Sequence, residues 1–201
     1  MDDEAKHKHN VTLKRKKLVI DEQIALAQEN RGVLVLITGD GKGKTTSAFG
    51  TAFRALGHGM RVGIIQFIKG TQATGEVIYL TQQHPQLAYH AMATGFTWDT
   101  RDWDKDKTAA EETWVYARRM LTDPEIQLVV LDELTYMLTY EYLSMADVIQ
   151  AMRQRPTRQN VIVTGRDAKP ELIAIADTVS EIAAVKHAFK DGVKAQPGMD
   201  F

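Results

Sequence analysis

A glycine-rich segment between an apolar run and a helical pattern carries the first chemical signal of the sequence. It spans residues 39–46 and reads Gly-Asp-Gly-Lys-Gly-Lys-Thr-Thr. Glycines let the backbone turn its N–H groups inward around an anion, and a helix that starts there adds partial positive charge. A lysine in such a loop reaches phosphate oxygens, and the following threonine hydroxyl ligates Mg²⁺. The segment predicts a phosphate-binding loop formed by Gly39, Asp40, Gly41, Lys42, Gly43, Lys44, Thr45 and Thr46.

The loop departs from the usual P-loop pattern, G-x-x-x-x-G-K-[ST], at one position. When the pattern is aligned on Gly43, Lys44 and Thr45, its first glycine falls on residue 38, where the sequence has Thr38. A glycine-rich turn without a ligand is the alternative interpretation, but the expected strand before the loop and the helix after it favour phosphate. We therefore expect a bound triphosphate, and the altered loop leaves its direction open.

Two acidic residues, Asp132 and Glu133, end an apolar run that starts at Ile126. Acids in this position are commonly helix caps, but in phosphate-binding folds a carboxylate at the end of a strand also holds Mg²⁺. The loop and the acids would meet at the same edge of a parallel sheet. Successive side chains of an extended strand point to opposite faces, so we expect one metal ligand. We favour Glu133, with Asp132 orienting water or the side chains of Thr45 and Lys44, or acting as the alternative ligand.

Apolar runs alternate with helical patterns from residue 33 onward, which is typical of βαβ units and a parallel sheet. Several runs are continuous in Val, Ile and Leu, as expected for strands that helices cover on both faces. Strands are expected at 33–38, 61–68, 87–93, 126–131, 160–164 and 178–184. Helices are expected at 48–56, 76–83, 105–121, 144–153 and 170–176. The sequence predicts an α/β fold, a doubly wound and mostly parallel six-stranded sheet of the P-loop NTPase type.

The first 30 residues differ from the rest of the chain in character. Residues 1–17 hold six lysines or arginines and three acids, a local excess of three positive charges, without apolar periodicity. We interpret them as a solvated tail or as an arm that touches an anionic ligand. Apolar residues at near-helical spacing predict a short helix over 18–30. The expected organisation is a basic arm with a short helix over 1–30 and one α/β domain over 31–201.

The composition excludes several classes of function. The 201 residues contain 25 Lys and Arg against 26 Asp and Glu, so the net charge is −1, without the excess of a dedicated nucleic-acid binder. With no cysteine, the chain has no thiolate metal site and no thiol nucleophile. The longest apolar run, 33–37, is too short to span a bilayer, and no apolar signal segment opens the sequence. We expect a cytoplasmic protein with no membrane span and no nucleic-acid partner.

Several short segments together resemble the ATP:corrinoid adenosyltransferases of the P-loop type. Besides the loop, they are residues 66–70, 93–98, 131–136, 164–166 and 185–189, and the similarity runs from about residue 31 to residue 201. The resemblance implies a RecA-like fold that transfers the 5′-deoxyadenosyl group of ATP to the Co(I) centre of a corrinoid and releases inorganic triphosphate. It also implies a triphosphate reversed relative to ordinary P-loop enzymes, and a role in cobalamin biosynthesis and salvage.

The resemblance implies roles for the loop and the acids. Backbone N–H groups of the loop, with Lys42 and Lys44, would stabilise charge on the triphosphate leaving group. Thr45 and Glu133 would hold Mg²⁺, with Mn²⁺ as an alternative ion. No side chain is needed as a nucleophile or a general base, because cobalt attacks carbon directly.

Two arginines are candidate phosphate clamps. Arg54 lies on the helix after the loop, and Arg166 follows Thr164 and Gly165. Most arginines in proteins are solvated surface residues, but the planar guanidinium group, with its several donors, suits phosphate. The resemblance favours both residues, Arg166 more than Arg54.

Phe96 and Trp98 lie two residues apart after an expected strand, outside any helical stripe. From the residues alone, buried packing is the commoner use of such aromatics, although binding residues often lie on such loops. In the family that the chain resembles, the matching aromatics lie under the corrin ring and displace the lower axial base. An aromatic face offers no lone pair to cobalt, so Co(II) becomes easier to reduce. The resemblance therefore implies a catalytic role for Phe96 and Trp98.

The resemblance also implies partners, and two other hypotheses stay open. The implied partners are ATP, cob(II)alamin or cob(I)alamin or a precursor corrinoid, a flavin or flavodoxin-type electron donor, and a second copy in a homodimer. In the family, the N-terminal segment can order over the corrinoid. One alternative is a RecA-like module that engages nucleic acid through residues 14–17, which the near-neutral charge disfavours. The other is a small-molecule kinase, which the shortened loop disfavours.

Overall fold

A computed structural model describes residues 2–68, 74–92 and 102–201 of the chain. The chain divides into two units, Met1–Arg31 and Gly32–Phe201, which are described here one after the other. No helix in these ranges is long and apolar enough to cross a membrane.

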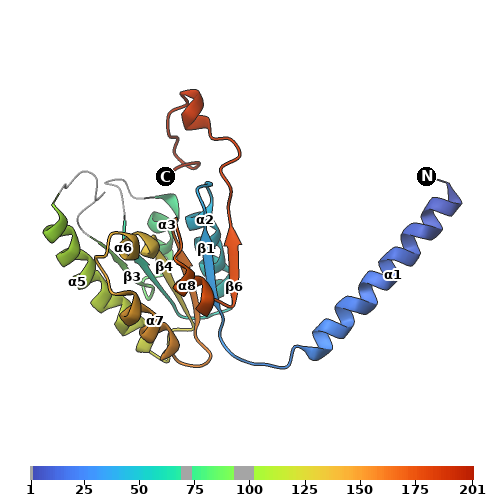
Figure 1. Cartoon of the computed structure of the whole chain (residues 1–201), viewed down its shortest axis with the longest axis horizontal. Coiled ribbons are helices and arrows are strands. Elements are labelled where there is room, and N and C mark those ends of the chain that lie inside the picture. The colour runs from blue at the N-terminus through green and yellow to red at the C-terminus, as the bar shows by residue number, and fades with distance from the viewer. Residues whose placement is uncertain (1, 69–73, 93–101) are drawn as a thin grey trace. The chain divides into compact units, whose positions relative to one another are not determined.

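The larger unit is built on a six-stranded sheet in the order β3-β2-β4-β5-β1-β6, and each neighbouring pair is parallel (Figure 1). The strands are β1 (Leu34–Thr38), β2 (Val62–Gln66), β3 (Ala88–Ala91), β4 (Leu128–Asp132), β5 (Asn160–Thr164) and β6 (Thr178–Glu181). The prediction of a six-stranded α/β sheet is confirmed, and the sheet is wholly rather than mostly parallel. Most strands are shorter than the apolar runs that predicted them, because the ends of those runs continue into loops.

Helices cover both faces of this sheet. Two of them, α2 (Lys44–Gly57) and α3 (Gly75–Gln83), lie on one face. The other face is covered by α5 (Trp103–Thr122), α6 (Leu134–Thr139), α7 (Met145–Arg153) and α8 (Pro170–Ile175). Each expected helix is present, and α6 was not expected, because six residues directly after a strand are too few to display a helical period.

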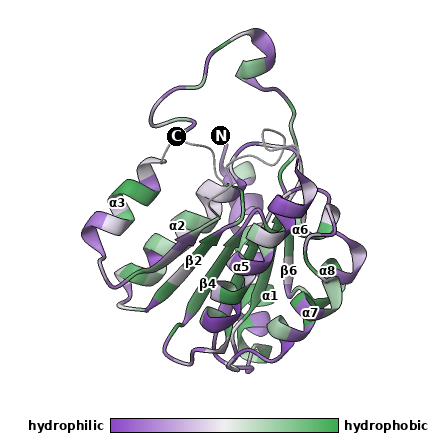
Figure 2. Cartoon of the chain, turned by 90° about the vertical axis from the view of Figure 1, so that its left-hand side faces the viewer, coloured by the Kyte–Doolittle hydropathy of each residue, from purple (hydrophilic) through white to green (hydrophobic). Residues whose placement is uncertain are grey.

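The alternation of side chains along β4 shows how the sheet separates two cores. Leu128 and Val130 pack into the core beneath α2 and α3, whereas Val129 and Leu131 pack into the core beneath α5. All four are buried, as the continuous apolar run predicted for a strand covered on both sides. Figure 2 shows the hydrophobic colouring concentrated on the central strands β2 and β4. This rigid centre fixes the strand ends that carry the polar residues described below.

The smaller unit contains one helix, α1 (Asp3–Leu26), none of whose residues is buried. This corrects the expectation of an irregular tail over residues 1–17 followed by a short helix from residue 18. The Asp2 side chain caps the helix by accepting the N–H of Ala5, and acids fill the first turn. Lysine, arginine and glutamine have high helix propensity, so a fully solvated helix needs no apolar periodicity. The lack of apolar periodicity in residues 1–17 therefore did not indicate an irregular tail.

The chain after β6 forms the last part of the larger unit. It contains a short 3₁₀ helix, η1 (Ala188–Asp191), and then an irregular segment to residue 201. This segment leaves the end of β6 and turns back towards the start of α2 (Figure 1).

Candidate functional site

A large pocket opens where β1, β2 and β4 end. Its volume is about 940 Å³. The predicted loop residues from Asp40 to Thr46 line it, together with Asp132, Glu133 and Arg166. The structure thus brings together most of the side chains that the sequence singled out, at the edge where parallel sheets bind ligands.

The phosphate loop lies against the segment that follows β6. Gly39 has a φ of 98°, and a side chain there would collide with the carbonyl of Ile182, 2.5 Å from the Cβ position. Gly41 approaches the same carbonyl, and its N–H donates to it at 2.7 Å. Glycine is needed at both positions because the two backbones touch. The N–H of Gly41, which we expected to face the triphosphate, is therefore directed to Ile182, and Gly39 does not line the pocket.

The side chain of Lys44 is hydrogen-bonded to the backbone of the phosphate loop. It is the first residue of α2, its side chain is buried, and its Nζ donates to the carbonyl of Gly41 at 2.8 Å. Burial lowers the pKa of Lys44, and the charge of Glu133 opposes this effect. A cation fixed in this way is oriented before any ligand arrives.

Asp132 at the end of β4 is the most heavily hydrogen-bonded side chain of the pocket. Its Oδ1 accepts the hydroxyls of Thr45 at 3.0 Å and Thr164 at 2.6 Å, and its Oδ2 accepts Nε2 of Gln66 at 3.0 Å. The carboxyl is 1% exposed. Burial raises the pKa of Asp132, while the three hydrogen bonds lower it. These contacts suit a residue that orients Thr45, one of the two roles that the sequence suggested.

Glu133 occupies a different conformation from the one we assumed. Its φ of 60° is left-handed, so the chain leaves the strand here and α6 begins at the next residue. The side chains of Asp132 and Glu133 consequently line the same pocket instead of opposite faces. Burial and the charge of Asp132 raise the pKa of Glu133 to about 7. Its Oε2 is buried and has no hydrogen-bond partner within the described part of the chain.

Arg166 lies at the rim of the pocket. Its Nη1 is 3.4 Å from Oδ1 of Asp40, a loop residue, and about half of each side chain or more is exposed. The guanidinium is therefore close to the loop but not locked in place, because exposed ion pairs are weak.

Comparison with known proteins identifies the family. Residues 30–201 match the family model described as ATP:corrinoid adenosyltransferase BtuR/CobO/CobP. The chain belongs to this family. A corrinoid adenosyltransferase of Escherichia coli (strain K12) is 49% identical over 201 residues, all of both chains. One from Pseudomonas aeruginosa is 49% identical over 98% of both chains. Corrinoid adenosyltransferase CobA of Salmonella typhimurium is 52% identical over 90% of this chain and 92% of its own.

Arg54, like Gly39, is a predicted site residue of this family member that does not line the pocket. Arg54 lies in the last turn of α2, ten residues after Lys44, which corresponds to roughly 15 Å along a helix. It is exposed and lines a separate, mostly apolar pocket with His58 and Met60. Within one chain the structure does not support a phosphate contact by Arg54.

The aromatic pair of the family resemblance, Phe96 and Trp98, lies outside the described residues. The structure shows only where the chain enters that segment. Met92 is buried after β3, and its N–H donates to the carbonyl of Gln66 on β2 at 2.9 Å. The roles of Phe96 and Trp98 therefore stay predictions.

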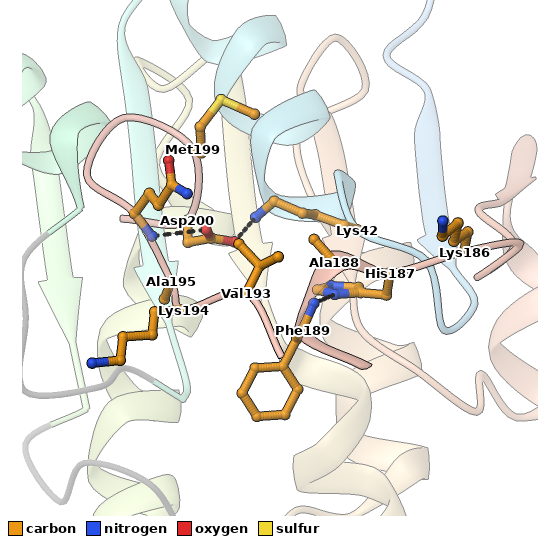
Figure 3. A pocket seen from close by; sticks show the side chains of 11 residues that line it. Lys42, Lys186, His187, Ala188, Phe189, Val193, Lys194, Ala195, Met199 and Asp200 are labelled. Atoms are coloured by element: carbon orange, nitrogen blue, oxygen red, sulfur yellow. Dashed lines mark hydrogen bonds and ion pairs between the residues drawn. The ribbon is translucent and has the colours of Figure 1, made fainter. Parts of the chain in front are cut away.

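The C-terminal segment contributes residues that sequence reasoning missed. Asp200 places Oδ1 2.9 Å from Nζ of Lys42, and the N–H of Gln196 donates to the other carboxylate oxygen at 3.0 Å (Figure 3). Residues 198–201 line the large pocket. A neighbouring cavity of about 320 Å³ lies between Lys42, His187, Phe189 and this segment. An isolated acid 158 positions after Lys42 has no spacing that would have signalled the contact.

Proposed function

We propose that the chain transfers the 5′-deoxyadenosyl group of ATP to the Co(I) centre of cobalamin or a precursor corrinoid and releases inorganic triphosphate. The observation that carries the proposal is the convergence of Lys44, Thr45, Asp132 and Glu133 on one pocket, in a chain about half identical over its length to corrinoid adenosyltransferases. Membership of the family selects this reaction among those that a phosphate loop can serve.

The cations around the loop would stabilise the leaving group. Cobalt attacks C5′, a cobalt–carbon bond forms, and the C5′–oxygen bond breaks with its electron pair remaining on triphosphate. Negative charge thus builds where Lys42, Lys44 and Arg166 surround the pocket. Prearranged charges of this kind are often the largest catalytic contribution. The step needs no general base. This agrees with the two buried acids of the pocket, because Asp132 is already hydrogen-bonded and Glu133 is suited to a cation.

The donor set fits Mg²⁺, with Mn²⁺ as an alternative. Among the residues that the structure describes, none donates to the buried Oε2 of Glu133. The hydroxyl of Thr45 points its proton at Asp132, which leaves its lone pairs for a cation. No cluster of three or more metal-ligating side chains exists in the ranges that the structure describes. Magnesium usually binds through one or two carboxylates together with phosphate oxygens, so this sparse set is the expected one. When bound, the ion would neutralise part of the triphosphate charge.

Three further proposals rest on the family resemblance. Phe96 and Trp98 would displace the lower axial base of the corrinoid. A flavin or flavodoxin-type donor would supply the electron that converts Co(II) to Co(I). The working form would be a homodimer, in which α1, a helix without buried residues, is available to cover a corrinoid.

A spectroscopic assay tests the proposed function. The protein is incubated with Mg-ATP and chemically reduced cob(I)alamin, and the absorbance of adenosylcobalamin is followed. We expect its appearance to depend on protein, ATP and Mg²⁺. Release of orthophosphate or a phosphorylated product without any cobalt–carbon product would refute the proposal.

A further inference from the structure

A chain of hydrogen bonds runs across three strands to the metal-binding region. The hydroxyl of Tyr89 on β3 donates to Oε1 of Gln66 on β2 at 2.8 Å. Nε2 of Gln66 donates to Oδ2 of Asp132 on β4 at 3.0 Å, and Oδ1 of Asp132 accepts the hydroxyl of Thr45 on α2 at 3.0 Å. Gln66 is 3% exposed and Asp132 1%. The hydrogen bond between Gln66 and Asp132 at the centre of the chain is thus shielded from water, and those made by Tyr89 and Thr45 are partly buried. Losing a shielded hydrogen bond is costly.

The direction of each donor in this chain is determined by chemistry. A carboxylate only accepts, so Gln66 must present its amide nitrogen to Asp132 and its amide oxygen to Tyr89. Asp132 therefore selects the orientation of the amide, since the reversed amide would place its oxygen against a carboxylate oxygen, and Tyr89 holds the selected orientation by donating to the amide oxygen. With Oδ2 occupied by Gln66 and Oδ1 shared by Thr164 and Thr45, Asp132 has one defined position. The hydroxyl proton of Thr45 is then directed at Asp132, and the lone pairs of this hydroxyl stay available to a cation.

We infer that Tyr89 and Gln66 are positioning residues for the metal ion of this reaction. They fix Asp132, and through Asp132 they hold the Thr45 hydroxyl with its lone pairs towards the pocket. Neither residue needs to touch ATP, the corrinoid or the metal ion. The inference rests on the proposed function for the identity of the ion, and it adds two residues whose effect is transmitted through Asp132.

A purely structural role is the competing explanation, because the same contacts also hold the edge strand β3 against β2. The two explanations differ in what the removal of one hydroxyl changes. A structural contact affects the melting temperature alone, whereas a positioning contact affects the affinity for the metal ion.

The test measures the dissociation constant of Mn²⁺ in the presence of saturating ATP, by electron paramagnetic resonance of free Mn²⁺, for the full chain. Tyr89→Phe removes one hydrogen bond and should raise it about three- to tenfold. Gln66→Met removes two hydrogen bonds and should raise it at least as much. The affinity for ATP without metal should stay unchanged. Tyr116→Phe is the matched control. Tyr116 on α5 stacks on His90, the neighbour of Tyr89 on β3, with ring centroids 3.9 Å apart, and in the described part of the chain it takes no part in these hydrogen bonds.

An unchanged Mn²⁺ affinity in Tyr89→Phe, with or without a lower melting temperature, would overturn the inference. Tyr89→Phe removes one oxygen atom and decides the question even if Gln66→Met does not fold. The measurement contains no corrinoid. If the wild-type protein binds Mn²⁺ and ATP but forms no cobalt–carbon bond, the proposed function is refuted. The effect of Tyr89→Phe on Mn²⁺ affinity then still decides this inference.

Discussion

The ammonium group of Lys42 lies 2.9 Å from a carboxylate oxygen of Asp200, so an acid from the C-terminal segment rests on the phosphate loop. Both side chains are partly exposed, and hydrogen bonds from Lys42 and Gln196 lower the pKa of Asp200. The carboxylate holds the lysine that we propose for the triphosphate. ATP must therefore share or displace this ion pair when it binds.

Replacing Asp200 should strengthen ATP binding. Exposed ion pairs are weak, so Asp200→Asn should lower the dissociation constant for ATP by a small factor, up to about five. Isothermal titration with ATP measures this. Asp191→Asn is the control, because Asp191 pairs with Lys186, 3.4 Å away, outside the large pocket. Weaker binding by Asp200→Asn would show that this segment supports the nucleotide instead of competing with it.

The buried carboxyl of Glu133 should make the ligand-free protein sensitive to pH. Its pKa of about 7 exceeds the ordinary value of 4.5, so the folded state binds the proton more tightly than the unfolded state does. The associated stability is fully present below pH 4.5 and is lost as the pH rises to about 7. The gap between the two values corresponds to at most roughly 3 kcal/mol.

Glu133→Gln removes this titration and should stabilise the ligand-free protein at pH 8 more than at pH 5. Denaturant unfolding in the presence of a chelator measures the effect. The same variant should require a much higher Mg²⁺ concentration for adenosyl transfer, because it lacks the anionic ligand. An equal change of stability at both pH values would contradict the assigned environment of Glu133.

The sequence predicted the parts of this site that follow from local pattern. The apolar run over 160–164 coincides with β5, and the glycine-rich segment forms the loop before α2. The acids after residue 131 reach the pocket because a buried strand ends there. These features depend on short stretches of chain whose periodicity and turn chemistry are visible in the residues themselves.

The parts that could not be predicted depend on contacts between distant segments. The left-handed conformation of Glu133 brings both acids to one pocket. An apolar pattern predicts a strand but does not show at which residue the backbone stops being extended. The use of the Gly41 N–H by Ile182 and the pairing of Lys42 with Asp200 join residues more than 140 positions apart. Arg54 lies in the last turn of α2, away from the loop of its own chain, and its role as a phosphate clamp stays a prediction.

The aromatic pair should matter for reduction of cobalt more than for its alkylation. We expect Phe96→Ala and Trp98→Ala to impair turnover from Co(II) with a reductant far more than turnover from preformed Co(I), because only the first requires loss of the lower axial base. Parallel assays with cob(II)alamin and cob(I)alamin measure the two rates. Equal losses in both assays would mean that these side chains only pack.

Removal of α1 should leave the larger unit folded. No residue of α1 is buried, so deletion of residues 2–26 should change the melting temperature by no more than a few degrees. If α1 covers the corrinoid, the KM for cob(I)alamin should rise while the KM for ATP stays constant. An unchanged KM for both substrates would mean that α1 is a solvated extension that does not contact the corrinoid.

Counting both products of one reaction is the most direct test of adenosyl transfer from ATP to the corrinoid. Wild-type protein, Mg-ATP and excess cob(I)alamin are incubated in the dark without oxygen, and inorganic triphosphate and light-sensitive adenosylcobalamin are quantified in the same samples. We expect the two products in equal amounts, because one C5′–oxygen bond breaks for each cobalt–carbon bond formed. Diphosphate or orthophosphate as the primary product, or triphosphate without adenosylcobalamin, would contradict this expectation.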